Sequence, residues 1–175
     1  MKIIDLGCGK NKRKGSIGVD FNKDSHADLI HDLNCYPYPF RDSECDYIYL
    51  DNSLEHLDDT IKVMEEVYRI LKPGGVCKVI VPYFRSRYAF IDPTHKKFFT
   101  VDSFIYFDPD NFIFKNVAYT KAKFKLIKLV FNENLKNSLF EKFLSNFAQK
   151  HPYFYENYLS HLIPLDDISY YLKKI

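Results

Sequence analysis

A glycine turn followed by an acidic residue is the strongest chemical signal in this sequence. The turn consists of Asp5, Leu6, Gly7, Cys8 and Gly9. Asp20 ends the next apolar run, fifteen residues after Asp5. Glycines at the carboxyl end of a strand let the chain turn tightly and let a ligand approach the backbone, and an acidic residue after the next strand can bind two ribose hydroxyls. The pattern favours a nucleoside-binding α/β domain over a purely structural turn.

Cationic residues crowd the same turn. They are Lys10, Lys12, Arg13 and Lys14. Such a run would suit a phosphate, so a dinucleotide is an alternative ligand, and solvated surface charge is the simpler interpretation.

Candidate acid–base residues lie in a loop-like stretch after Val81. The ordinary pKa of His95 lets it take up a proton near neutrality, and Asp92, three residues earlier, could orient it across a proline turn. We therefore expect His95 to act as a general base with Asp92 as its partner. A contact with the substrate and a purely structural role are the alternatives.

Candidate substrate contacts occur in the same stretch and just after the strand-like residues 46–50. They are His56, Tyr83, Arg85 and Arg87. The two arginines, with Lys96 and Lys97, would favour a substrate with a phosphate, carboxylate or other anion. Solvated cations and a buried loop aromatic explain the same residues equally well.

The elements that must carry these residues follow an α/β pattern. Apolar runs at 2–6, 17–20 and 46–50 predict strands. Residues 76–81 are apolar and β-branched on both faces, which predicts a central parallel strand covered by helices on each side.

A helix is expected between the third and fourth of these strands. Its apolar residues keep helical spacing, at Ile61, Met64, Val67 and Leu71. Asp58 or Asp59 would cap its N-terminus, and the Pro-Gly-Gly run at 73–75 would end it.

The second half of the chain is richer in aromatic residues. Residues 82–115 predict long loops with a short helix around 102–107, and loops of that length are usually functional. Residues 124–131 and 168–175 predict strands. A capping box at Ser138 predicts a helix whose aromatic stripe we expect in the core. The stripe consists of Phe140, Phe143 and Phe147.

Several segments, taken in order, resemble the class I S-adenosylmethionine-dependent methyltransferases, in particular the small type-11-like group. The matching segments are DLGCG at 5–9, IGVD at 17–20, HDL with PYPF at 31–40, DYIY and SLEHL at 46–57, and RILKPGG at 69–75. They cover residues 1–81, and a DPTH motif follows at 92–95. Each motif is common by itself, but the ordered set is specific.

The resemblance implies S-adenosylmethionine as cofactor and S-adenosylhomocysteine as product. It implies a cofactor site made of Asp5, Leu6, Gly7, Cys8, Gly9, Asp20, Phe21, Asp32, Leu33 and Asn52. Asp20 would hold the ribose, Asp32 would accept a hydrogen bond from the adenine amino group, and Phe21 would pack on the adenine. The Asp5 side chain would orient the glycine turn.

The fold that follows is a Rossmann-like class I methyltransferase fold, a mostly parallel sheet with an antiparallel terminal hairpin. About ten residues separate Gly7 from Val19, fewer than a helical crossover needs, so the first crossover must be shortened. We expect one domain, 1–175, with a cofactor-binding half at 1–81, acceptor or lid loops at 82–115, and terminal strands and a helix at 116–175. No covering helix precedes the first strand, so residues 82–115 are expected to cover the cofactor.

Composition agrees with a soluble globular protein. The 175 residues are 46% hydrophobic and 27% charged, and the net charge of +2 is too small for a general electrostatic grip on nucleic acid. No apolar run reaches the roughly 20 residues of a membrane-spanning helix, so we expect a cytoplasmic protein without a membrane partner. The four cysteines lack the spacing of a zinc site, and no metal is expected.

The predicted activity is transfer of a methyl group from S-adenosylmethionine to a small molecule or biosynthetic intermediate. A non-catalytic module that binds the cofactor, a subunit that needs a partner, and an RNA methyltransferase are the alternatives. A homodimer is a further expectation, because C-terminal aromatic residues could bury against a second copy. They are Tyr153, Phe154, Tyr155 and Tyr158.

Overall fold

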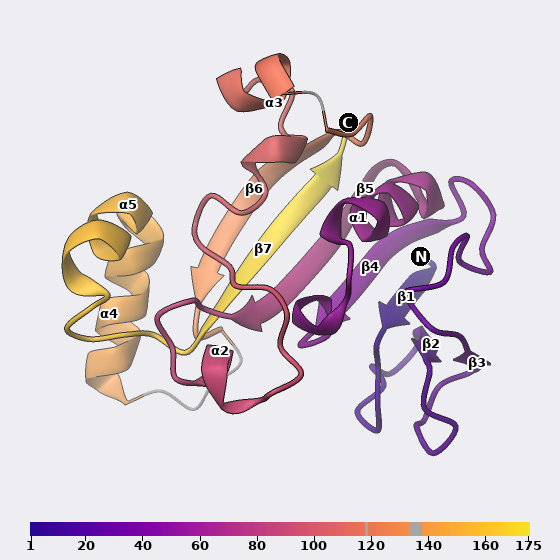
Figure 1. Cartoon of the computed structure of the whole chain (residues 1–175), viewed down its shortest axis with the longest axis horizontal. Helices are drawn as coiled ribbons and strands as arrows, with labels where there is room; N and C mark the ends of the chain where they lie inside the picture. The colour runs from indigo at the N-terminus through magenta and orange to yellow at the C-terminus, as the bar shows by residue number, and fades with distance from the viewer. Residues whose placement is uncertain (118, 134–137) are drawn as a thin grey trace.

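The computed structural model describes residues 1–117, 119–133 and 138–175 (Figure 1). Its strands are β1 (Ile3–Leu6), β2 (Ile17–Asp20), β3 (Leu29–Ile30), β4 (Cys45–Asp51), β5 (Leu71–Pro82), β6 (Phe124–Phe131) and β7 (Asp167–Lys174). Its helices are α1 (Thr60–Ile70), α2 (Tyr88–Ile91), α3 (Phe112–Val117), α4 (Leu139–Lys150) and α5 (Pro152–Phe154). Single tight or wide helical turns are η1 (Leu54–His56), η2 (Ile105–Phe107) and η3 (Tyr155–Leu159).

All seven strands form one sheet in the order β3-β2-β1-β4-β5-β7-β6. The first five are parallel, and β7 runs antiparallel to both of its neighbours, β5 and β6. The predicted mostly parallel sheet with an antiparallel terminal hairpin is thereby confirmed. The direction of strand order reverses between β1 and β4, and a crevice for ligands opens at the carboxyl ends of strands at such a point.

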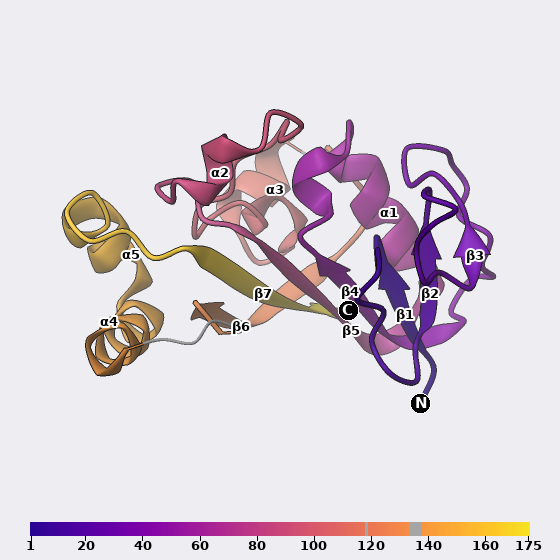
Figure 2. The same cartoon turned by 90° about the horizontal axis from the view of Figure 1, so that it is seen from below.

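The connection from β1 to β2 contains no helix, as its length predicts. It is held by the backbone, since the Gly7 and Cys8 amides donate to the Val19 carbonyl at 2.8 and 3.2 Å. No helix is therefore placed on the sheet by this connection, and α1, α2 and α3 all lie on one face of the sheet (Figure 2). Over β1, β4 and β5 the described residues place no helix on the other face, which is lined by half-buried tyrosines such as Tyr47 and Tyr49. The expectation of helices on both sides of 76–81 is therefore wrong.

Helix α1 begins as predicted and ends earlier. The Asp59 carboxylate caps it by accepting from the Ile61 and Lys62 amides at 3.0 and 3.1 Å. The helix ends at Ile70 because Leu71 already pairs with Cys45 of β4. The Pro-Gly-Gly run at 73–75, expected to end the helix, lies inside β5 instead.

Helix α4 starts with the predicted capping box, but its aromatic stripe does not enter the core. Phe140 is 57% exposed and Phe143 is 69% exposed. The helix lies beside the β6 edge of the sheet (Figure 1) and buries the smaller residues Leu144 and Ala148. The face that carries the large rings is turned away, so the prediction that this stripe is core is wrong for these two residues.

The C-terminal aromatic residues divide in the same way. Tyr155 is completely buried within its own chain, and its hydroxyl donates to the Ile163 carbonyl at 3.0 Å. Tyr153, Phe154 and Tyr158 remain 59, 50 and 62% exposed. A contact between two copies stays a prediction for these three, whereas Tyr155 has an internal role.

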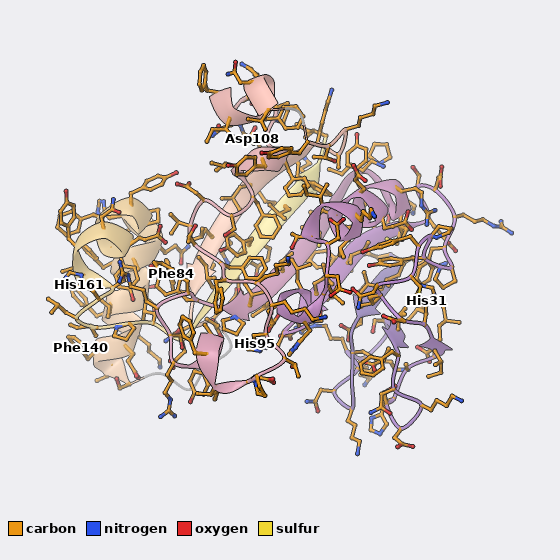
Figure 3. The ribbon with its side chains drawn as sticks, in the orientation of Figure 1. His31, Phe84, His95, Asp108, Phe140 and His161 are labelled. Atoms are coloured by element: carbon orange, nitrogen blue, oxygen red, sulfur yellow. The ribbon has the colours of Figure 1, made fainter. Side chains whose placement is uncertain are left out.

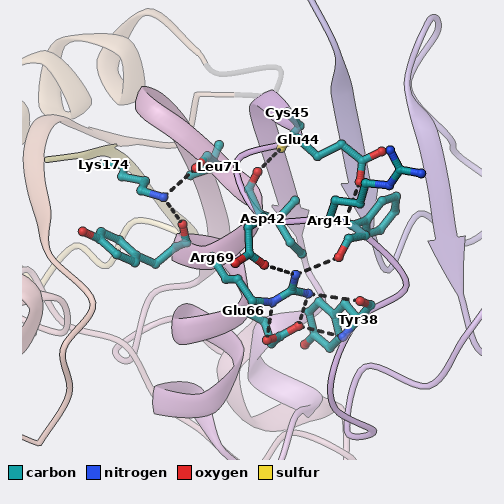
Figure 4. Close-up of polar contacts among 12 residues, drawn as sticks. Tyr38, Arg41, Asp42, Glu44, Cys45, Glu66, Arg69, Leu71 and Lys174 are labelled. Carbon is teal, nitrogen blue, oxygen red and sulfur yellow. Dashed lines mark hydrogen bonds and ion pairs between the residues drawn. The ribbon is translucent and has the colours of Figure 1, made fainter.

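Arg69 of α1 joins the helix to the loop that precedes β4 (Figure 4). Its guanidinium donates to both Glu66 oxygens at 2.8 and 2.7 Å, and to Asp42 at 2.9 Å. It also donates to the carbonyls of Phe40 and Tyr38 at 2.7 and 3.1 Å. The same loop carries residues 32–33, so this network fixes the position of one wall of the candidate site.

Replacing Arg69 with methionine is expected to lower the free energy of unfolding by about 2 kcal/mol, since it leaves Glu66 and two carbonyls without a charged donor. The matched change Lys62→Met removes a long ion pair from the exposed face of the same helix and should cost less than about 0.5 kcal/mol. Urea unfolding of the two variants measures both. Equal midpoints would contradict this account of the network.

Candidate functional site

A cavity of about 620 Å³ opens at the carboxyl ends of β1, β2 and β4. Six of the residues predicted to bind the cofactor line it, namely Gly7, Asp20, Phe21, Asp32, Leu33 and Asn52. Segments far apart in the sequence meet there because parallel strands present their carboxyl ends at one edge of the sheet.

Gly7 is required by its surroundings. Its φ of +75° is a conformation that side chains oppose, and a Cβ atom there would lie 2.5 Å from Cβ of Ser53. Gly9 also has a positive φ, of +51°, but no atom lies within 4 Å of where its Cβ would be. The turn is thus tight on the side of β4 and open where a ligand can approach the backbone.

Asp20 is held in place by the glycine turn. Its Oδ2 accepts from the Gly9 amide at 2.8 Å and its Oδ1 accepts from the Asn22 amide at 2.9 Å, while the residue is only 7% exposed. A carboxylate has about four acceptor positions, so lone pairs remain for two hydroxyl donors. The geometry therefore suits a ribose.

The wall opposite the glycine turn combines polar and apolar groups. Asp32 is exposed and accepts from the Asn34 amide at 2.9 Å, whereas Leu33 is buried below it. Phe21 is 74% exposed at the cavity, so its ring is accessible to a ligand bound there. A flat apolar ring system with a polar edge would satisfy all three.

The other predicted cofactor residues lie behind the cavity wall. Asp5 is 2% exposed and accepts from the Arg13 amide at 2.8 Å, which agrees with its expected role of orienting the turn. Leu6 and Cys8 are buried, and Gly9 contributes its amide to Asp20. None of these four lines the cavity in this structure, and a direct contact with the cofactor stays a prediction.

The cations of the same turn are partly engaged. Lys12 pairs with Asp28 at 2.8 Å, and Arg13 pairs with Asp51 while its guanidinium lies 4.1 Å from the ring centre of Tyr49. Neither lines the cavity. The alternative of a phosphate-binding turn therefore loses its two best-placed donors.

Several lining residues were missed by sequence reasoning. They are Asn34, Ser53, Leu57, Pro93 and Thr94, and the cavity is also lined by Lys96, which was expected only as a cation near the substrate. Ser53 could have been found as the residue next to Asn52. The last three come from residues 82–115, so this segment does border the cofactor cavity. The segment does more than cover the cavity, because its residues Phe99, Phe104 and Phe107 are part of the hydrophobic core.

A second cavity of about 500 Å³ adjoins the first and shares Asn52 and His56 with it. Its lining residues are Asn52, Glu55, His56, Pro82, Tyr88, Ile91, Asp92, His95, Asp166 and Asp167. The structure thus brings together the predicted residues His56, Asp92 and His95. Figure 3 shows His95 beside α2.

The remaining predicted substrate contacts lie elsewhere. Tyr83 is completely buried and its hydroxyl donates to Glu156 at 3.2 Å, so it is part of the core. Arg85 and Arg87 are exposed, and their guanidinium groups stack 4.9 Å from the rings of the neighbouring residues 84 and 88. None of the three lines either cavity, and a contact of Arg85 or Arg87 with a substrate stays a prediction.

The charge of the second cavity is negative. Four carboxylic acids line it, Glu55, Asp92, Asp166 and Asp167, and of the described residues no lysine or arginine does. Burial raises the pKa of Asp167 to about 6. This lining does not suit the anionic substrate that the arginines had suggested.

The histidines of the second cavity are held by their Nδ1 atoms. His95 Nδ1 donates to the Ala89 carbonyl at 3.1 Å. The Thr94 hydroxyl donates to Asp92 at 2.7 Å and therefore accepts from His56 Nδ1 at 2.9 Å. The expected pair of Asp92 and His95 is thus not formed, because the tight turn directs the Asp92 carboxylate onto Thr94, and Asp92 orients His56 instead.

Glu55 was not singled out from the sequence, where it is one acidic residue in the run SLEHL. It is 1% exposed, and neither carboxylate oxygen has a hydrogen-bond partner among the described residues. Burial raises its pKa to about 8. Only the fold, which turns this side chain inwards from η1, distinguishes it from a surface acid.

Comparisons with known proteins identify the first half of the chain. Residues 4–79 match the family model of the methyltransferase domain. This match supports the predicted resemblance of residues 1–81 to the class I S-adenosylmethionine-dependent methyltransferases. The demethylmenaquinone methyltransferase of Listeria welshimeri is 32% identical over 84 residues, 42% of this chain and 35% of that protein. The dimethylglycine N-methyltransferase of Parasynechococcus marenigrum is 31% identical over 72 residues, 41% of this chain and 25% of that protein.

The whole fold has relatives among solved structures. A S-adenosylmethionine-dependent methyltransferase of Archaeoglobus fulgidus has a TM-score of 0.61, with 99% of this chain and 86% of that chain covered at 20% identity. That likeness extends the methyltransferase fold to residues 80–175. The predicted family and fold class are confirmed, although the match spans only about a third of the Listeria relative. In the described part of the chain, none of the helices is long and apolar enough to span a membrane.

Proposed function

We propose that this methyltransferase binds S-adenosylmethionine in the first cavity and transfers its methyl group to a small molecule in the second. The observation that carries the proposal is the pair of adjoining cavities at the carboxyl ends of β1, β2 and β4, with the two predicted ribose and adenine acids, Asp20 and Asp32, in the first. Methyl transfer needs an acceptor in line with the sulfonium carbon, and two joined compartments provide that arrangement.

In the first cavity the ribose would lie on Asp20 and the adenine between Phe21 and Leu33, with its amino group towards Asp32. The methionine portion would extend towards Gly7 and Asn52, where the second cavity begins. This places the methyl group at the boundary between the cavities. Pro93 and Thr94 close the opposite side and would exclude water there.

The acceptor belongs to a small, uncharged or cationic class, because the second cavity is lined by four carboxylic acids. A polyanion would meet like charge there, which disfavours RNA. The relatives from Listeria and Parasynechococcus, named for demethylmenaquinone and dimethylglycine, support a small-molecule acceptor. His95 acts at the acceptor, and Asp92 serves as a positioning residue that works through Thr94 on His56.

Calorimetric titration of the protein with S-adenosylhomocysteine tests the first step. We expect one site with a dissociation constant in the micromolar range, about −8 kcal/mol, and no binding of reduced nicotinamide cofactors under the same conditions. Transfer of labelled methyl groups from S-adenosylmethionine to quinol and amine pools then tests the second. Nicotinamide binding without S-adenosylhomocysteine binding would overturn the proposal.

A further inference from the structure

Three side chains of the second cavity form a compact cluster of metal-ligating atoms. One ligand atom each from Glu55, His56 and His95 lies within 4.8 Å of the other two. The imidazole rings are 4.7 Å apart between centroids and stand edge to face. Two of the residues come from η1 and the third from the turn after α2, so the cluster exists only in the folded chain.

Each histidine has its Nδ1 engaged in a hydrogen bond. In each ring Nδ1 carries the proton. His95 Nδ1 donates a hydrogen bond to the Ala89 carbonyl, and His56 Nδ1 donates one to the Thr94 hydroxyl. The neutral ring then has its lone pair on Nε2, and neither Nε2 has a hydrogen-bond partner among the described residues. In a metal site, the second ring nitrogen of a ligating histidine usually donates to a protein group, which fixes the tautomer. Here His56 Nδ1 donates to the Thr94 hydroxyl, and that hydroxyl donates to Asp92.

Glu55 supplies an independent observation. A buried carboxylate is normally paired or hydrogen-bonded, because removal from water without a partner costs several kcal/mol. Among the described residues Glu55 has neither at 1% exposure, and one of its carboxylate oxygens lies within 4.8 Å of a ring nitrogen of each histidine. No lysine or arginine of the described chain lines this cavity to neutralise it. A bound cation would provide the missing partner.

We propose that Glu55, His56 and His95 bind one divalent transition-metal ion, of which Zn²⁺ is the best match. Two imidazole nitrogens and one carboxylate oxygen are a frequent catalytic ligand set for zinc, with the fourth position left to water or substrate. Tetrahedral coordination needs ligand atoms about 3.4 Å apart, so atoms that lie within 4.8 Å of one another need to approach by at most about 1.4 Å on binding. The further acids Asp166 and Asp167 line the same cavity and would favour a cation there.

The role of the ion rests on the proposed function. Because His56 borders both cavities, an acceptor oxygen in the fourth position would face the methyl group. Coordination lowers the pKa of a hydroxyl, so its proton passes to water. The oxygen then forms a bond to the methyl carbon while the carbon–sulfur bond breaks, and the electron pair returns to sulfur to give S-adenosylhomocysteine. His95 is in this case a ligand and not the base.

The site is tested by titrating chelator-treated protein with Zn²⁺ alone, followed by calorimetry, and with Co²⁺, followed by visible absorption. We expect one equivalent of Zn²⁺ at micromolar affinity or better and Co²⁺ bands without the near-ultraviolet absorption of thiolate ligands. Glu55→Gln and His95→Asn should each weaken Zn²⁺ binding at least tenfold, about 1.4 kcal/mol. His161→Asn is the matched control, because this histidine is exposed and lies far from His95 near α4 and α5 (Figure 3).

Thermal unfolding and S-adenosylhomocysteine titration accompany each variant, so that loss of the fold is separated from loss of a ligand. Because His95 is only partly buried, His95→Asn keeps the test valid should Glu55→Gln fail to fold. Zn²⁺ affinity equal in wild type and His95→Asn, or a thiolate band with Co²⁺, would overturn the metal site. Zn²⁺ binding without S-adenosylhomocysteine binding would instead overturn the proposed function and leave the metal site standing.

Discussion

Replacing Asp20 with alanine is expected to weaken S-adenosylhomocysteine binding by ten- to a hundredfold, about 1.4 to 2.7 kcal/mol. The carboxylate is buried at the edge of the first cavity and is fixed by the amides of Gly9 and Asn22. Two ribose hydroxyls would each donate to it, and hydrogen bonds to a charged group contribute about 1.5 kcal/mol or more. Calorimetric titration of the variant measures the loss.

The matched control is Asp24→Ala, which removes the same charge from an exposed position of the same turn. We expect its affinity to stay within about twofold of wild type, since an exposed charge at that distance is screened. Asp20→Ala also loses the hydrogen bond that the Gly9 amide donates to Asp20, so the unfolding midpoint of this variant has to be measured. If Asp20→Ala folds and binds S-adenosylhomocysteine with unchanged affinity, the ribose does not bind at this end of β2.

Replacing Gly7 with alanine is expected to lower the free energy of unfolding by about 2 to 4 kcal/mol and to abolish cofactor binding. Two effects add at this position. The φ of +75° opposes any side chain, and the new Cβ would lie 2.5 Å from Cβ of Ser53. Relief would require β1 and β4 to separate where the cavity begins. Urea unfolding and S-adenosylhomocysteine titration measure the two results.

Gly15 offers a control that separates the two effects. Its φ of +79° is nearly the same, but no atom lies within 4 Å of its Cβ position. Gly15→Ala should therefore cost only the backbone strain, about 1 kcal/mol. In addition, Ser53→Gly should restore part of the stability of Gly7→Ala, because it removes the atom in conflict. A double variant no more stable than the single one would show that the contact with Ser53 is not the cause.

Local sequence by itself determined several of the elements and some of the residues that line the first cavity. Hydrophobic periodicity located β1, β2, β4 and α1, because alternation and helical spacing are properties of short segments. Glycines at a strand end followed by an acid at the next strand end are equally local, and they identified Gly7 and Asp20. Motif order then indicated the family, because the ordered set of motifs is specific although each motif is common by itself.

Tertiary structure decided which face of each element is covered. The stripe of α4 has the spacing of a core helix, yet Phe140 and Phe143 are exposed because the helix meets only the edge of the sheet. Tyr83 was expected to contact the substrate, but its side chain is completely buried in the core. Periodicity shows that one face of a helix or strand is apolar, but only the tertiary structure shows which other element that face contacts.

The second cavity was also decided by the tertiary structure. His56 and His95 are far apart in the sequence, and the acid expected to orient His95 orients His56 instead. Glu55 is one acidic residue of the SLEHL motif, and only its burial shows that its carboxylate has no hydrogen-bond partner among the described residues. Hydrogen-bond direction, burial and the meeting of distant loops are relations between residues in space. The sequence therefore determined the strand ends that border the first cavity, and the fold alone assembled the cluster of Glu55, His56 and His95 beside it.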